Sequence, residues 1–214
     1  MIRKILRKHS VATLLLLACC AFATPPALAQ RGAAEARELS GAELLRELRQ
    51  GGYILYFRHG YTDFSKNDET MTSLDDCANQ RNLTDAGRAQ LRAIGEKIRA
   101  LAIPVDKVWA SPFCRTVETG MLIFGRAEQN GDVRGGPGTA NDPQRYAGLR
   151  KLFSTAPPTG TNFAIASHGN PFHALAGPPY LAEGEAAVVR PRGENFIVVA
   201  RIRAEQWDEL RPAR

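Results

Sequence analysis

The stretch YILYFRHGYTD, residues 53–63, decides how the rest of the sequence is interpreted. Its first five residues are all apolar and rich in strand formers, which is typical of a strand buried on both faces of a sheet. The apolar run then ends abruptly in Arg58, His59 and Gly60. Charged and titratable side chains directly after a buried strand indicate a site at that end of the sheet.

Amphipathic helices are predicted on either side of this strand. The first begins with a capping box at residues 40–43 and ends at Gly51-Gly52. The second begins at Thr84 and ends before Pro104. Their apolar faces consist of Leu44, Leu45 and Leu48 in the first and Leu91, Ile94, Ile98 and Leu101 in the second. Each face is expected to pack against the sheet.

Strands and helices continue to alternate along the chain. The remaining predicted elements are a strand at 108–110, a helix from Ser111-Pro112 toward Gly125, a surface loop at 131–143, a helix at 146–153, a strand at 163–166, a helix start at Asn170-Pro171, and strands at 187–189 and 196–202. This alternation predicts an α/β fold, a three-layer sandwich with a mainly parallel central sheet flanked by helices.

Three of the predicted strands run directly into polar residues. The first is followed by Arg58 and His59, the second by a helix with Arg115 in its first turn, and the third by Ser167 and His168. In parallel α/β sheets, ligands bind outside the carboxyl ends of the strands. The sequence therefore predicts one site that contains two arginines and two histidines.

These residue types favour a phosphate-like dianion as the ligand. The planar fork of an arginine matches phosphate oxygens in two-point contacts and keeps its charge. A neutral imidazole nitrogen can attack phosphorus near neutral pH, while a second, protonated histidine can hold the transferring oxygens. Taken singly, the histidines could equally be core residues and the arginines members of surface ion pairs.

Four motifs resemble the histidine phosphatase superfamily, the group that also contains the cofactor-dependent phosphoglycerate mutases. Residues 58–60, RHG, resemble its signature, and residues 83–87, LTDAG, resemble its LTxxG helix start. Residues 111–119, SPFCRTVET, resemble its SxxxRxxxT segment, and residues 167–169 resemble its late SHG. The order and the strand context also agree, over about residues 52–191.

The resemblance implies roles at the matching positions. His59 would be the nucleophile and would form a phosphohistidine that water later hydrolyses. Arg58, Arg115 and His168 would bind the phosphoryl group and stabilise its equatorial oxygens. No cofactor is implied, and three histidines after the first 29 residues, with no clustered ligand spacing, argue against a metal site.

Three further residues are expected to bind the substrate, namely Thr62, Arg81 and Asn170. Arg81 would contact the rest of an anionic substrate, although an exposed arginine beside a helix is the simpler interpretation. The substrate is expected to be a small-molecule or envelope phosphomonoester.

The proton donor departs from the family pattern. Many members place a glutamate some twenty residues beyond the second arginine, where this chain has only the loop around Glu128 and Asp132. Asp63, four residues after His59, is the preferred candidate, and Glu118 is the alternative. Both could also be ordinary salt-bridge or helix-face carboxylates.

Residues 63–82 lie where the family builds its substrate pocket, and they contain Cys77. A disulfide between Cys77 and Cys114 is expected, because two cysteines remain after the signal described below in a chain that the signal sends to an oxidising compartment. Such a bridge would tether this loop beside Arg115 and shape the pocket wall.

The N-terminal segment predicts export. Residues 1–29 combine a basic start, an apolar stretch and the small-residue cleavage signal Ala27-Leu28-Ala29. A loose leader at 30–39 would precede a single domain at 40–214. Export implies a periplasmic or secreted bacterial protein, and the alternative is a lipoprotein attached through Cys19.

Removing this segment lowers the formal net charge from +6 to +2, which gives no argument for nucleic acid as a partner. No apolar run after it is long enough to span a membrane. The sequence contains no feature that reports on the oligomeric state.

Two other functions remain open. A phosphoglycerate mutase-like phosphotransferase would share the motifs, but its metabolites are cytosolic and this chain is predicted to be exported. An exported protein that binds a phosphate ligand without turnover would share every feature. A cysteine-dependent phosphatase is excluded, because neither Cys77 nor Cys114 is followed by the required arginine six residues later.

Overall fold

The computed structural model describes residues 38–134, 142 and 144–211. All of them belong to one compact unit, Ala34–Arg214. The predicted signal at 1–29 and most of the predicted leader lie outside the described residues, as does the greater part of the predicted loop at 131–143.

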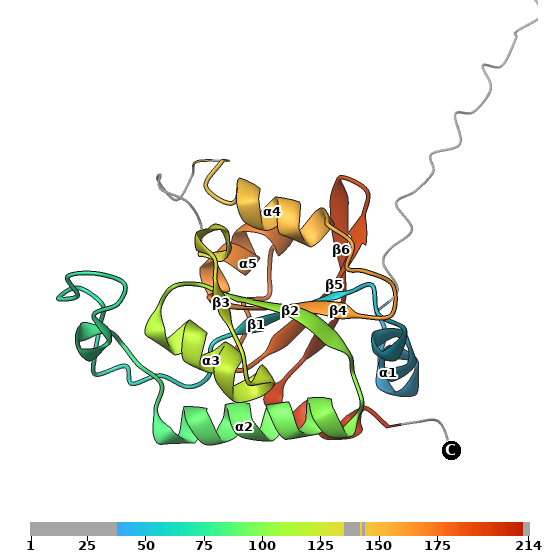
Figure 1. Ribbon diagram of the computed structural model, residues 1–214, viewed down its shortest axis with the longest axis horizontal. Helices are drawn as coiled ribbons and strands as arrows, with labels where there is room; N and C mark the ends of the chain where they lie inside the picture. Colours follow the sequence, from blue (N-terminus) through green and yellow to red (C-terminus); the bar gives the residue numbers. More distant parts are fainter. Residues whose placement is uncertain (1–37, 135–141, 143, 212–214) are drawn as a thin grey trace, which may run out of the picture. The chain divides into compact units, whose positions relative to one another are not determined.

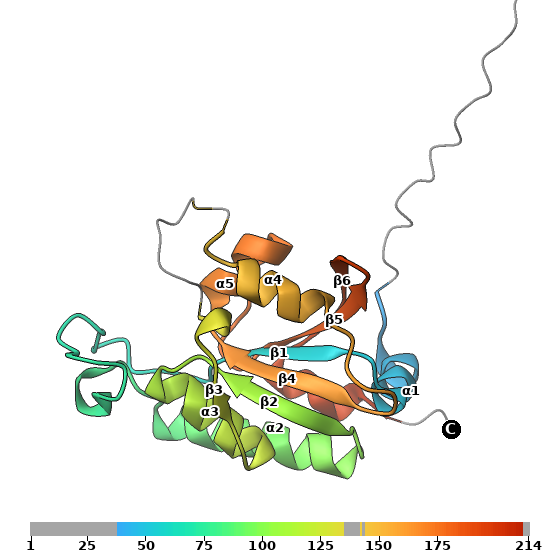
Figure 2. The same cartoon turned by 45° about the horizontal axis from the view of Figure 1, so that its top comes forward.

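The centre of this unit is a six-stranded sheet with the order β3-β2-β4-β1-β5-β6. Its strands are β1 Ile54–Arg58, β2 Val105–Ala110, β3 Glu128–Gln129, β4 Asn162–Ser167, β5 Ala186–Arg192 and β6 Asn195–Ile202. The pairs β3–β2, β2–β4 and β4–β1 are parallel, whereas β1–β5 and β5–β6 are antiparallel. The predicted mainly parallel central sheet is confirmed (Figure 2).

Helices cover both faces of the sheet, as the alternation of elements predicted (Figure 1). The helices are α1 Gly41–Gln50, α2 Asp85–Ala100, α3 Cys114–Phe124, α4 Ala147–Ser154 and α5 Gly169–Ala176, with short 3-10 helices η1 Cys77–Asn79, η2 Gly131–Val133 and η3 Ala204–Glu209. The three layers of the predicted sandwich are therefore present.

The side chains of β1 show how one strand serves both layers. Successive residues of a strand point to opposite faces. Leu55 and Phe57 join the core beneath α1, α2 and α3, whereas Ile54 and Tyr56 join the core beneath α4 and α5. All four are fully buried, and each contributes about 1.5–3 kcal/mol by leaving water. The prediction of a strand buried on both faces is confirmed.

Helix α2 begins as the sequence predicted. The hydroxyl of Thr84 accepts a hydrogen bond from the main-chain N–H of Gly87 at 3.0 Å. A Cβ atom at Gly87 would collide with the main chain of Tyr61, so only glycine lets the loop after β1 lie against this helix. The helix ends at Ala100, slightly earlier than the proline at 104 suggested.

The beginnings of three other helices differ from the sequence prediction. Helix α3 starts at Cys114 rather than beside Ser111, because the N–H of Ser111 continues the sheet by donating to Ala166 O at 3.0 Å. Helix α5 starts at Gly169, one residue before Asn170. The predicted capping box of α1 is wrong, because the Ser40 side chain makes no capping hydrogen bond.

Candidate active site

The register of the parallel strands brings the predicted site residues together. Arg58 in β1 pairs with Ser167 in β4, and Ala110 in β2 pairs with Ala166 in the same strand. The N–H of His59 donates to Ser167 O at 3.0 Å. The carboxyl ends of β1, β2 and β4 therefore lie side by side, and the ring centroids of His59 and His168 are 5.7 Å apart.

A cavity of about 250 Å³ opens beside these two histidines. Its lining is basic and aromatic, and the described lining residues include five arginines and no carboxylate. The described lining consists of Arg58, His59, Arg81, Phe113, Arg115, Arg134, Arg145, Tyr146, His168, Gly169, Asn170, Pro171 and Tyr180. Such a surface attracts an anion.

The ring of His59 is held in one tautomer. Its Nδ1 lies 2.9 Å from the carbonyl oxygen of Gly60, and a carbonyl can only accept, so Nδ1 carries the proton. The lone pair is then on Nε2. Because the side chain is only 2% exposed, burial lowers the pKa of His59 to about 3, and the charges of Arg115 and Arg58 act in the same direction. The imidazole is therefore neutral at physiological pH.

A carboxylate that was not predicted from the sequence lies near Nδ1 of this histidine. Glu183 Oε1 accepts a hydrogen bond from the Thr62 hydroxyl at 2.7 Å and lies 3.7 Å from Nδ1 of His59. It also lies 3.6 Å from Nη2 of Arg58, and its side chain is only 9% exposed. No motif marks Glu183, which lies between α5 and β5, so its role depends entirely on how the chain folds.

His168 is fixed by contacts from both neighbouring strands. Its Nε2 lies 2.8 Å from the Ser111 hydroxyl at the end of β2, and its carbonyl oxygen accepts from the Tyr56 hydroxyl of β1 at 2.6 Å. Burial holds the pKa of His168 well below its usual value, and the charge of Arg115 acts in the same direction. A bound anion would oppose this effect and favour the protonated ring.

Arg58 and Arg115 are each oriented by protein oxygens and still keep a donor free. Arg58 Nη1 donates to Leu181 O at 2.7 Å, and Arg115 Nη1 donates to Asp68 Oδ1 at 2.9 Å. The Nε atoms of both arginines are buried without a hydrogen-bond partner among the described residues. Buried donors without partners are costly, so an anion in the cavity would satisfy them.

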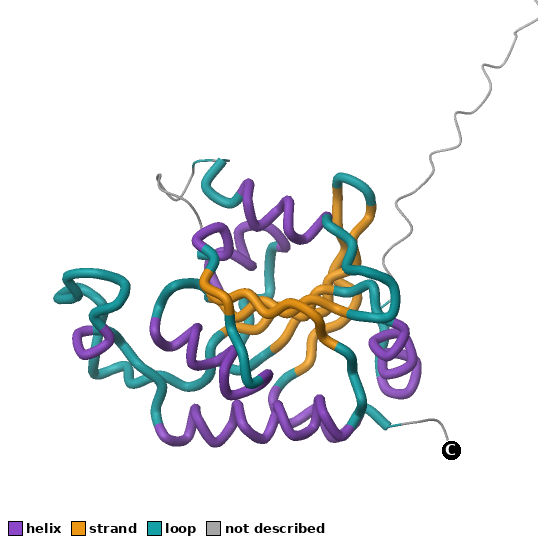
Figure 3. The backbone as a smooth tube through the Cα atoms, in the orientation of Figure 1, coloured by secondary structure: helices purple, strands orange, loops and turns teal. Residues whose placement is uncertain are grey.

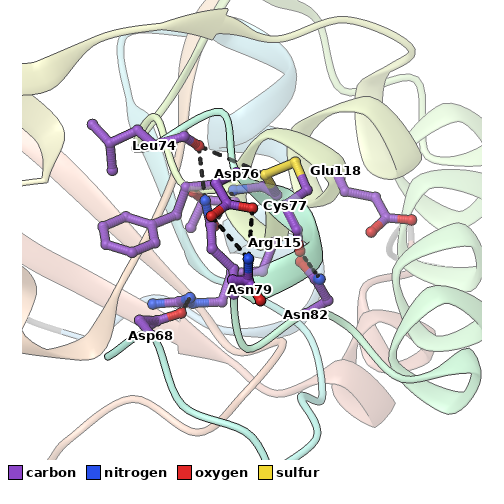
Figure 4. Close-up of a disulfide and its surroundings, with 12 residues drawn as sticks. Asp68, Leu74, Asp76, Cys77, Asn79, Asn82, Arg115 and Glu118 are labelled. Atoms are coloured by element: carbon purple, nitrogen blue, oxygen red, sulfur yellow. Dashed lines mark hydrogen bonds and ion pairs between the residues drawn. A yellow bond between two sulfur atoms is a disulfide. The ribbon is translucent and has the colours of Figure 1, made fainter. Parts of the chain in front are cut away.

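The predicted disulfide between Cys77 and Cys114 is confirmed (Figure 4). The loop between β1 and α2, which contains Cys77, extends beside α3 (Figure 3). Beside the bridge, the Cys114 N–H donates to Gln80 Oε1 at 2.9 Å. The bridge thus fastens this loop to the first turn of α3, where Arg115 follows directly.

The same loop supplies oxygens that hold Arg115 in place. Besides Asp68, the main-chain oxygen of Arg81 accepts from Arg115 Nη1 at 3.3 Å. Arg81 itself lines the cavity, and its role in binding substrate stays a prediction. The loop is therefore part of the wall of the site.

Not every candidate residue lies in the cavity. Asp63 is partly exposed and does not line the cavity, and its carboxylate accepts hydrogen bonds from the N–H and hydroxyl of Ser65. Glu118, the other candidate for the proton donor, is paired with Arg88 at 2.7 Å. Thr62 contacts Glu183 instead of the cavity. The structure thus gives neither carboxylate candidate a position beside His59.

Asn170 does line the cavity, and its side-chain oxygen accepts from the Tyr180 hydroxyl at 2.6 Å. The ring of Tyr180 also lies under the guanidinium of Arg58 at 5.1 Å. A Cβ atom at Gly169 would collide with this ring, so glycine after His168 allows the tyrosine to approach. Tyr180 was not predicted, because its position depends on the loop after α5.

Two features are absent from the described part of the chain, a metal-binding cluster and a helix that could span a membrane. No group of three or more His, Cys, Asp or Glu side chains there is arranged to hold a metal ion. No helix there is both long enough and apolar enough to cross a membrane.

Comparison with known proteins agrees with this geometry. Residues 54–134 match the model of the histidine phosphatase superfamily (branch 1). This range includes three of the four motifs, and the SHG at 167–169 lies beyond it. The mitochondrial serine/threonine-protein phosphatase Pgam5 of Drosophila virilis is 35% identical over 77 residues, 36% of this chain and 23% of that protein. The Drosophila mojavensis protein is 37% identical over 73 residues, 34% of this chain and 22% of that protein.

The chain therefore aligns with less than a quarter of the length of these curated relatives. Among solved structures, the protein histidine phosphatase SixA complexed with tungstate is similar with a TM-score of 0.50 and 18% identity. The similarity covers 71% of this chain and 97% of that one. At this identity the match supports the fold, the same three-layer arrangement described above.

Proposed function

The chain belongs to the histidine phosphatase superfamily, and we propose that it is a phosphomonoesterase that acts through a phosphohistidine on His59. The observation that carries the proposal is the neutral imidazole of His59, with its lone pair on Nε2, beside a cavity lined by arginines. A neutral nucleophile next to fixed positive charge is the arrangement that phosphoryl transfer requires.

In the first step, Nε2 of His59 attacks phosphorus and the bond from phosphorus to the ester oxygen breaks. Arg58, Arg115 and His168 hold the equatorial oxygens, on which charge is spread in the transition state. The ring of His59 keeps its proton on Nδ1 and becomes positively charged as the bond forms. Glu183, 3.7 Å from Nδ1, stabilises this charge.

In the second step, a water molecule attacks phosphorus and the bond between phosphorus and Nε2 breaks. The water gives up a proton to solvent, inorganic phosphate is formed, and Nε2 recovers its lone pair. The carbonyl of Gly60 keeps the proton on Nδ1 through both steps, so the ring returns in the same tautomer. The enzyme is then ready for another substrate.

The departing oxygen must also gain a proton. No carboxyl group among the described lining residues is placed to supply it, so we propose that water in the cavity does so. Without a positioned acid, the rate should depend strongly on how easily the leaving group departs. Esters of acidic alcohols and phenols should therefore be the better substrates.

We also propose that the protein is exported and acts on a small-molecule or envelope phosphomonoester. The pattern at residues 1–29 and the disulfide both support an oxidising compartment. Sequencing the N-terminus of the protein from cell fractions tests this proposal. A start at Gln30 in the periplasm or medium is expected, and a full-length N-terminus in the cytosol would contradict it.

Phosphate release from a panel of phosphomonoesters at pH 4–8, with a chelator present, tests the enzymatic proposal. The wild type should turn over, and His59→Ala should lose at least about a thousandfold in kcat. His173→Gln is the matched control, because His173 is exposed and does not line the cavity. A radiolabelled phosphoryl group should be trapped on the wild type in a rapid quench.

Three results would redirect or overturn the proposal. Transfer of the phosphoryl group to a second hydroxyl compound rather than to water would indicate a mutase-like phosphotransferase. Phosphate binding without release from any ester would indicate a binding protein. Full activity in His59→Ala would rule out the phosphohistidine mechanism.

A further inference from the structure

The arginines of the cavity differ in their partners. Arg58 lies 3.6 Å from Glu183, and Arg115 lies 2.9 Å from Asp68, so each has a carboxylate beside it. Arg81 and Arg134 have no carboxylate or hydrogen-bonding partner for their guanidinium groups among the described residues. Each lies on an aromatic ring instead, Arg81 on Phe64 at 4.8 Å and Arg134 on Phe113 at 5.3 Å.

Both of these arginines are adjacent to the proposed phosphoryl site. The guanidinium carbon of Arg115 lies 4.5 Å from the centre of the Phe113 ring, and that of Arg134 lies 5.3 Å from the same centre. The guanidinium carbons of Arg115 and Arg134 are therefore at most about 10 Å apart. The carbonyl of Arg81 binds Arg115 directly, and Nε of Arg81 is buried without a hydrogen-bond partner. Arg81 and Arg134 therefore both line the cavity that holds the proposed phosphoryl site.

The phosphoryl group does not need these two cations. Its oxygens already have donors in Arg58, Arg115 and His168, which all line the cavity, and the Nε atoms of the two arginines have no hydrogen-bond partner among the described residues. A guanidinium group that lines a cavity without a carboxylate beside it attracts an anion. Aromatic rings hold the guanidinium groups in position without neutralising them.

We propose that Arg81 and Arg134 form a second anion site, so that the substrate is a phosphomonoester with a further phosphate or carboxylate group. This inference rests on the proposed function, because it takes the transferred phosphoryl group to bind at Arg58 and Arg115. It narrows the substrate class from any phosphomonoester to one that carries two separate anionic groups. A monoester with a neutral alcohol would leave Arg81 and Arg134 without a partner.

Phosphonates test the proposal independently of turnover, because their carbon–phosphorus bond is not hydrolysed. The affinities of α,ω-alkanediphosphonates with one to six methylenes are measured by calorimetry, each against the alkylphosphonate of equal length. ω-Carboxyalkylphosphonates form a second series, which distinguishes a carboxylate from a phosphate as the second group. At one chain length the diphosphonate or the carboxylate should bind at least about tenfold more tightly than the matched alkylphosphonate.

The variants Arg134→Gln and Arg81→Gln identify the residues responsible. Each should reduce the preference for the doubly anionic probe by about fivefold or more. Arg134 is exposed, so its replacement is not expected to disturb folding. Arg92→Gln, which removes an exposed charge from α2 outside the cavity, is the matched control and should leave the preference within about twofold.

The proposal is overturned if no doubly anionic probe binds more tightly than its matched alkylphosphonate. It is also overturned if Arg134→Gln and Arg81→Gln weaken both members of each pair equally, since the two arginines would then serve the phosphoryl group or the general field. Failure of the phosphatase proposal would appear separately, as absent turnover of esters with the phosphonate preferences unchanged.

Discussion

His59 and its immediate neighbours show how single residues set the chemistry. The Gly60 carbonyl fixes the proton on Nδ1, and burial keeps the ring neutral. The sequence identified His59, because the RHG motif at the end of an apolar run is a local pattern. Glu183 was not identified, because a carboxylate 124 residues later in the chain carries no local signal.

Replacing Glu183 by Gln tests whether this carboxylate stabilises the charged ring. The amide keeps a similar shape and can still accept from Thr62, but the negative charge 3.7 Å from Nδ1 is lost. We expect kcat to fall about tenfold, with a larger effect on formation of the phosphohistidine than on substrate affinity. Rapid-quench measurement of the phosphoenzyme separates the two effects.

Glu194→Gln provides the control, because Glu194 is exposed in the turn between β5 and β6. It should leave both rates unchanged. If Glu183→Gln forms the phosphohistidine at the wild-type rate and differs only in melting temperature, Glu183 is a structural residue and the assignment fails.

At the scale of elements, the strands were predicted more reliably than the helix starts. Apolar runs mark β1, β4, β5 and β6 because burial on a sheet selects them directly. The start of α3 was predicted two residues too early, because Ser111 has the local features of a cap but its N–H bonds to β4 and its hydroxyl to His168. Contacts with β4 and His168 therefore decided that Ser111 extends the sheet rather than caps the helix.

The disulfide joins two elements and gives a prediction at this scale. The bridge closes a segment with a sequence separation of 37 residues, for which the chain-entropy model gives about 3–4 kcal/mol of stabilisation. We expect the double variant Cys77→Ser, Cys114→Ser to lose up to this amount in denaturant unfolding. Because the loop that carries Asp68 and Arg81 loses its anchor, kcat/KM should also fall.

Reduction of the wild type should reproduce both changes, and the double variant should not respond to the reductant. If reduction leaves activity and the unfolding midpoint unchanged, the bridge has no influence on the wall of the site.

At the scale of the whole molecule, His59 and His168 couple the free energy of unfolding to pH. The pKa of His59 is about 3 in the folded protein, against about 6.5 in an unfolded chain. Above pH 6.5 the ring is neutral in both states. Between pH 6.5 and 3 the unfolded state binds a proton that the folded state does not, so the free energy of unfolding falls as the pH falls.

We therefore expect the free energy of unfolding to fall by up to about 1.4 kcal/mol for each pH unit of acidification in this range because of His59. His168 acts in the same direction. Denaturant unfolding at a series of pH values between 7 and 4 measures this slope. His59→Gln should flatten it, and His173→Gln, at an exposed position, should not. An equal slope in wild type and His59→Gln would contradict the prediction.

The sequence by itself determined the order of the helices and of every strand except the short, exposed β3, the mainly parallel sheet, and four residues that the fold brings to one cavity: Arg58, His59, Arg115 and His168. These follow from patterns within short segments, because burial on a strand and motifs at its end are local properties.

Only the tertiary structure decided how the remaining side chains combine. It placed Glu183 behind His59, left Asp63 outside the cavity, and brought Arg134 beside Phe113 and Arg115. The reason is that these residues lie on loops, which carry no periodic pattern. Their positions depend on strand pairings and on the disulfide between Cys77 and Cys114, which join segments that are distant along the chain.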